Sequence, residues 1–116
     1  MPAIHISKLL TDSGDEIRLD YNNLRKTLLV IRSVNHKIRQ QMIHLLTEHP
    51  RLTVTEMYLK MRLEQSIASQ HLAILRRSNI VTTKRIGKCV YYSLNKDRLE
   101  NIGSLIKELA KEDAKG

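Results

Sequence analysis

The stretch IVTTKRIGKCVYYSL, residues 80–94, constrains the fold of this chain more than any other segment. β-Branched and aromatic residues stand on both sides of Gly87-Lys88, which is typical of two strands joined by a tight turn. Apolar and polar side chains alternate from residue 89 to 94, the period of a strand. Apolar residues in the rest of the chain recur with helical spacing. We therefore expect a mainly α-helical fold with one small β-hairpin.

Helical periodicity predicts five helices around this hairpin. They are residues 20–33, a helix from an Asn35 cap to Pro50, a short helix capped by Thr53, and residues 64–78 and 97–112. Thr53 and Glu56 have the spacing of a capping box. Residues 1–19 show no sustained period, so we expect a flexible arm, then one domain over residues 20–112 and a tail over 113–116.

The helix predicted over residues 64–78 has an unusual polar side. Ala68, Leu72 and Leu75 form an apolar stripe that should face the core. The opposite side carries uncharged hydrogen-bonding residues at Gln65, Ser66, Ser69 and Gln70. Gln can pair with the edge of adenine in the major groove of DNA, and Ser can contact bases or phosphate. The alternative is that these residues are simply solvated.

Positive charge gathers in the middle of the chain. Residues 21–96 hold 14 Lys and Arg against 3 Glu, whereas both ends are slightly acidic and the whole chain carries +8. Lys84, Arg85 and Lys88 crowd the predicted hairpin tip, where long cationic side chains can reach a DNA backbone or minor groove. A short helix, a turn, a second helix and a basic hairpin together predict a winged helix-turn-helix that binds double-stranded DNA.

Residues 34–95 resemble the winged helix-turn-helix of the ArsR/SmtB family of bacterial and archaeal repressors. The resemblance lies in VNHKIRQQMIHLL, LEQSIASQHLAILRRSNIV and RIGKCVYYSLN, and in the pattern Ser69-x-His71-Leu72-x-x-Leu75. It implies a homodimer that binds an inverted-repeat operator and releases it when an effector, unknown here, arrives. The expected DNA-binding residues are Thr53, Thr55, Gln65, Ser66, Ser69, Gln70, Arg77, Lys84, Arg85 and Lys88.

The chain departs from this family at three places. Arg62 stands in the turn where a small residue or Gly is often found. Thr53-Val54-Thr55 replaces the Cys-Val-Cys stretch with which many members bind metals. The last helix has Lys96, Arg98, Leu109 and Glu112 where other members have Asp and His ligands. We therefore expect neither a metal site of these two kinds nor a cofactor.

His71 and Cys89 are the remaining candidates for sensing chemistry. His71 is expected to be a partly buried packing residue, with a ligand or pH sensor as the alternative. Cys89 is the only cysteine, so no disulfide can form within the chain. We expect it to be inert, because redox sensors usually have a resolving partner, although an intermolecular disulfide is the alternative.

The first and last helices are predicted to form the dimer interface. Their apolar residues lie outside the three-helix core and are Leu24, Leu28, Ile31, Leu99, Ile102, Ile106 and Leu109. Pairing two chains would bury both stripes in a two-fold interface. The alternative is that these helices pack only on their own domain.

We therefore expect a dimeric, sequence-specific DNA-binding regulator, and the family resemblance alone favours repression over activation. A winged helix that binds another protein, with little affinity for DNA, is the alternative. The residues form neither a nucleophile–base arrangement nor a Gly-rich phosphate loop, so no enzyme is expected. No apolar run approaches the length of a membrane span and no signal-peptide pattern is found, which predicts a cytoplasmic location.

Overall fold

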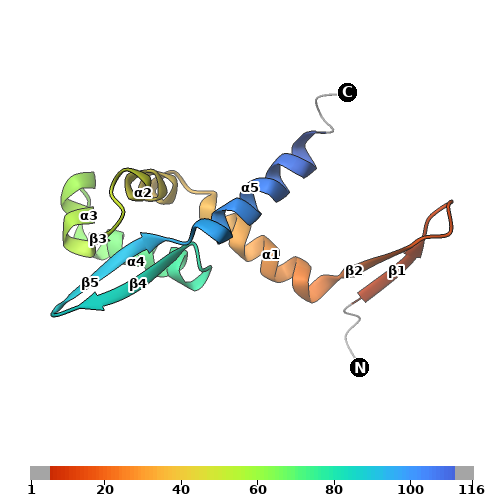
Figure 1. Ribbon diagram of the computed structural model, residues 1–116, viewed down its shortest axis with the longest axis horizontal. Coiled ribbons are helices and arrows are strands. Elements are labelled where there is room, and N and C mark those ends of the chain that lie inside the picture. Colours follow the sequence, from red (N-terminus) through yellow and green to blue (C-terminus); the bar gives the residue numbers. More distant parts are fainter. Residues whose placement is uncertain (1–5, 112–116) are drawn as a thin grey trace. The chain divides into compact units, whose positions relative to one another are not determined.

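The computed structural model describes residues 6–111, and it divides the chain into two compact units, Met1–Arg32 and Ser33–Gly116. The elements are labelled in Figure 1. The fold is mainly helical with a small hairpin, which confirms the predicted fold class. The division falls near the end of the first helix, and the predicted domain bounds at residues 20 and 112 stay a prediction. The predicted tail over 113–116 lies outside the described residues.

The first unit begins with a β-hairpin where the sequence predicts an arm without regular structure. Strands β1 (Ile6–Leu10) and β2 (Glu16–Asp20) pair antiparallel, with Leu9 opposite Ile17. Gly14 closes the connecting loop with a φ of +86°, a conformation that glycine adopts without strain. The sequence holds a short strand signal here, because Ile17 and Leu19 alternate with charged residues over the five residues of β2.

Helix α1 (Tyr21–Val34) follows β2 without a linker. Asp20 caps it, since its Oδ1 accepts hydrogen bonds from the backbone N–H groups of Asn22 (3.0 Å) and Asn23 (3.2 Å). The Tyr21 hydroxyl bonds the Ser7 hydroxyl of β1. Hairpin and helix are therefore tied to each other through the residues at their junction.

The second unit contains the helix-turn-helix. Its helices are α2 (Lys37–Glu48), α3 (Val54–Met61) and α4 (Gln65–Arg77). His36, not the predicted Asn35, caps α2, because its Nδ1 accepts the N–H of Ile38 at 3.1 Å. The buried apolar residues of this unit are Met42, Leu46, Leu52, Met57, Ala68, Leu72, Leu75, Ile80, Val81 and Ile102.

A three-stranded sheet completes the helix-turn-helix. The predicted hairpin forms from β4 (Val81–Ile86) and β5 (Cys89–Leu94), joined by Gly87-Lys88. Gly87 has a φ of +62°, as the first position of a two-residue type II′ turn requires. The two-residue strand β3 (Leu52–Thr53) pairs with the other side of β5, so the order is β3-β5-β4. A strand of two residues leaves no periodic signal in a sequence.

Helix α5 (Lys96–Ala110) begins directly after the hairpin. Asn95 caps it by accepting the N–H of Arg98 at 3.3 Å, and the N–H of Asn95 itself donates to Ile80 O at 2.9 Å. Arg98 Nε donates to the Ser78 carbonyl at the end of α4, at 3.1 Å. These bonds fasten the start of α5 to the segment that joins α4 to the sheet.

Candidate DNA-binding surface

Helix α4 separates its side chains into a buried face and an exposed polar face. Ala68, Leu72 and Leu75 are 0% exposed and contribute to the core. The polar residues that the sequence singles out all lie at the surface, and they are Gln65, Ser66, Ser69 and Gln70. Their placement together on the outer side of one helix follows the predicted pattern, and their contact with DNA stays a prediction.

The turn before α4 fixes the direction in which this helix leaves α3. Arg62 adopts the left-handed conformation, with φ 55° and ψ 43°. The N–H of Leu63 donates to Tyr58 O at 3.0 Å and that of Arg62 to Leu59 O at 3.3 Å, which is a Schellman-type closure of α3. Gly normally occupies such a position. Arg62 therefore adopts the conformation that the turn requires, although Gly would adopt it with less strain.

The N-terminus of α3 has the predicted capping box. The Thr53 hydroxyl accepts the N–H of Glu56 at 3.1 Å, and Glu56 Oε1 accepts the N–H of Thr53 at 3.0 Å. The backbone hydrogen bond from Thr53, and then the bond from its hydroxyl, lower the pKa of Glu56. Thr53 is half-buried and engaged in this cap, and its contact with DNA stays a prediction. Thr55 is exposed beside it.

The hairpin β4–β5 presents the predicted cluster of cations. Lys84, Arg85 and Lys88 are all exposed around the turn. Figure 1 shows the hairpin extending beyond the helices of its unit to a narrow tip. In the middle of the hairpin, the guanidinium of Arg51 lies 4.9 Å from the centre of the Tyr91 ring, a cation–π contact that holds β5 to the segment before β3. No local sequence pattern indicates this contact.

Arg77 is exposed in the last turn of α4, next to Arg76. Cations at this end of a helix interact favourably with its dipole. Arg77 can therefore stabilise α4 in addition to making its predicted contact with DNA.

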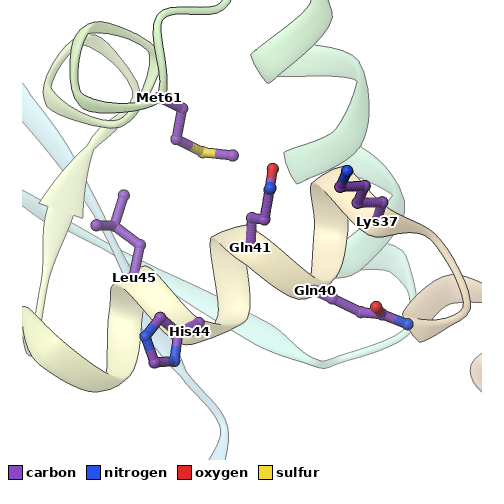
Figure 2. A pocket seen from close by; sticks show the side chains of 6 residues that line it. All are labelled: Lys37, Gln40, Gln41, His44, Leu45 and Met61. Atoms are coloured by element: carbon purple, nitrogen blue, oxygen red, sulfur yellow. The ribbon is translucent and has the colours of Figure 1, made fainter.

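A shallow groove lies between α2 and the end of α3 (Figure 2), with a volume of about 530 Å³. Gln41, Leu45 and Met61 face its open space from two helices. The rim includes His44, whose Nε2 lies 3.1 Å from Glu48 Oε1 on the same helix. The groove is apolar at its floor and has few polar groups that converge on one point, so it lacks the features of a specific ligand site.

Metal and redox chemistry would require suitable ligand or thiol groups among residues 6–111. That part of the chain has no group of three or more His, Cys, Asp or Glu residues arranged to hold a metal ion. Cys89 is exposed near the hairpin turn. Glu112, where the family places a possible ligand, lies outside the described residues. No described helix combines the length and hydropathy needed to cross a membrane.

The predicted dimer residues differ in exposure. Leu24 and Leu28 on α1 are 51% and 43% exposed, and Ile106 and Leu109 on α5 are 48% and 72% exposed. Ile31 and Leu99 are half-buried within their own chain. Ile102 is only 7% exposed and belongs to the core of its own unit, which corrects its assignment to the interface. The outward residues of each helix still form an apolar stripe that a single chain leaves uncovered.

Known proteins resemble both the sequence and the fold. The family model for bacterial regulatory proteins of the arsR family matches residues 36–83. The transcriptional repressor PagR of Bacillus anthracis is 29% identical over 77% of this chain and 89% of its own length. The transcriptional activator HlyU of Vibrio cholerae is 30% identical over 75% of this chain and 80% of its own length.

The crystal structure of PagR from Bacillus anthracis superposes with a TM-score of 0.62 at 30% identity. The match covers 75% of this chain and 99% of that one. The family model spans α2, α3 and α4 and ends within β4, so it includes the helix-turn-helix that carries the polar face of the candidate surface. The chain belongs to the arsR family of bacterial regulatory proteins, and it is a DNA-binding transcriptional regulator, not an enzyme.

Proposed function

We propose that this protein is a homodimeric repressor that binds an inverted-repeat operator and is released by an effector. The observation that carries the proposal is the exposed, uncharged polar face of α4 next to the cationic hairpin. In a winged helix-turn-helix the second helix enters the major groove. α4 holds that position here, with Gln65, Ser66, Ser69 and Gln70 directed outward.

Base recognition and backbone contact are assigned to different elements. Gln65 and Gln70 can each present an amide that donates one hydrogen bond and accepts another, as the edge of adenine requires. Lys84, Arg85 and Lys88 can contact phosphates without regard to sequence. Acidic side chains would be repelled by phosphate, and Glu64 is the single acidic residue of the sequence between Glu56 and Asp97.

The dimer is supported by the uncovered apolar stripes. Leu24 and Leu28 on α1, and Ile106 and Leu109 on α5, are too exposed to stabilise an isolated chain. A two-fold axis would bury them and place two copies of α4 about one turn of DNA apart. PagR is a repressor whereas HlyU is an activator, and the proposal of repression rests on the resemblance to the family of repressors.

The test is the affinity of Gln70→Ala for a labelled duplex that contains the operator. Loss of a bidentate contact to a base should weaken binding by about 1–3 kcal/mol on the operator and hardly at all on unrelated DNA. Asn101→Ala removes an exposed amide from α5 and is the matched control, with no effect expected. Equal losses on both duplexes would contradict base recognition by α4. Failure of the wild type to bind any duplex at low salt would favour the protein-binding alternative.

A further inference from the structure

One guanidinium joins three helical segments of the second unit. Arg39 on α2 donates from Nε to the carbonyl oxygen of Ser33 at 2.6 Å, and its Nη1 lies 3.1 Å from Nδ1 of His71 on α4. Ser33 belongs to the last turn of α1 and is 3% exposed. Arg39 therefore connects the end of the helix proposed for dimerisation to the helix proposed for reading DNA.

The bond to His71 requires a neutral imidazole. The guanidinium only donates and keeps its charge throughout the accessible pH range, so Nδ1 of His71 must accept and its proton must reside on Nε2. A proton on Nδ1 would remove the acceptor and place a second positive charge against Arg39. The contact would then change from a hydrogen bond to a repulsion.

The surroundings of His71 favour its neutral form. Burial of the ring lowers its pKa, and the neighbouring His36 and Arg39 lower it further. Both of these neighbours come from the start of α2. Helix α3 and strand β4 also pack against α4, and within the described residues they add no charge that acts on the ring.

His36 packs against the His71 ring at the start of α2. Its ring centre lies 4.6 Å from that of His71, and the two planes are inclined by 49°. Its Nδ1 accepts the N–H that begins α2, so this nitrogen is also used in its unprotonated form. The cap of α2 and the Arg39–His71 contact therefore lie at the same place.

We propose that Arg39 and neutral His71 are positioning residues that hold α4 in its DNA-reading orientation, so that acidification releases DNA. His71 directly follows Gln70, and a small rotation of α4 about its axis would move Gln70 and Ser69 away from the base edges. This inference rests on the proposed function. It predicts the opposite of simple electrostatics, because extra positive charge on a basic protein ordinarily strengthens binding to DNA.

The experiment follows the binding of the wild type to a fluorescein-labelled operator duplex from pH 8 to pH 5 at constant ionic strength. The affinity for the operator should decrease by about two- to tenfold as His71 takes up a proton. A decrease of this size corresponds to the net loss of one hydrogen bond. His71→Gln supplies a neutral acceptor for Arg39. It should keep the affinity of the wild type at pH 8 and lose the fall in acid.

His44→Gln is the matched control, because His44 is an exposed histidine on α2 whose removal should leave the fall in acid intact. A fall of equal size in His71→Gln, or tighter binding of the wild type in acid, would overturn the proposal. Arg39→Lys keeps the charge but cannot make both bonds with the same geometry. It should weaken binding at pH 8 even if His71→Gln does not fold.

Nuclear magnetic resonance of the free protein separates this proposal from the proposed function. In the wild type, the amide signals of α4 should shift together with the titration of the His71 ring, and in Arg39→Lys they should not. That result would uphold the link between Arg39 and α4 even if no duplex bound. Shifts that persist unchanged in Arg39→Lys would contradict it, whatever the affinity for DNA.

Discussion

Arg62 shows how a single residue can carry a conformational cost at the centre of a binding motif. A non-glycine residue in the left-handed conformation costs about 1–2 kcal/mol, and Arg62 holds it with φ 55° to close α3. The two backbone bonds at the turn retain it there. The chain tolerates the cost because the turn sets the angle between α3 and α4.

Replacing Arg62 with Gly should therefore stabilise the fold. Relief of the left-handed strain is partly offset by the greater freedom of Gly in the unfolded chain, which leaves a net gain of about 0.5–1 kcal/mol in the free energy of unfolding. Urea denaturation followed by circular dichroism measures it. Asn79→Gly is the control, because Asn79 has a φ of 60° but Asn tolerates this conformation, so its gain should be smaller. A loss of stability in Arg62→Gly would contradict the account.

Interactions between residues close in the sequence can be predicted from it, whereas contacts between distant residues cannot. The Thr53–Glu56 capping box was predictable because both partners lie within one turn of helix. The cap of α2 was placed at Asn35, one residue early, because His36 competes for the same role and the pattern does not distinguish them. The contact of Arg39 with His71 spans 32 residues, and no local pattern reports a contact that only the folded chain creates.

The helices and the hairpin β4–β5 were predicted because each has a clear period and a strong boundary. Strand β3 was missed because it is defined by pairing with β5 and not by its own two residues. The hairpin β1–β2 was missed for a related reason, since its apolar residues Leu9, Ile17 and Leu19 are 44–51% exposed and form little of a core. Elements with a clear local period were therefore predictable, whereas β3, which is defined only by its pairing with β5, was not.

The hairpin β4–β5 should act on DNA as a cationic element without sequence preference. Lys84→Ala should weaken binding to operator and unrelated duplexes by similar factors, because a phosphate is present in both. It should also reduce the slope of log affinity against log salt concentration by about 1. Fluorescence anisotropy across a range of salt concentrations measures both effects.

Lys107→Ala on α5 removes one positive charge from a surface away from the hairpin and is the control for the change in net charge. The slope in Lys107→Ala should remain that of the wild type. A loss in Lys84→Ala that is restricted to the operator would instead assign Lys84 to base recognition.

The whole molecule combines a compact DNA-binding unit with apolar stripes that one chain leaves uncovered. In the second unit Met42, Met57 and Leu72 are completely buried, and this core supports the inner face of α4. The stripes on α1 and α5 are explained if a second copy covers them, which would also double the DNA surface. The family was recognisable from residues 34–95, whereas the exposure of each stripe residue, such as the burial of Ile102, required the folded chain.

Selection of bound duplexes from a random pool, followed by sequencing, tests most directly whether two copies of α4 read base pairs. The wild type should enrich an inverted repeat whose half-sites are centred about 10–10.5 base pairs apart. Gln70→Ala should lose its preference at one position, and at the symmetric position of the other half-site. Enrichment of no common sequence, or of a single unrepeated site that Gln70→Ala reads unchanged, would contradict the account.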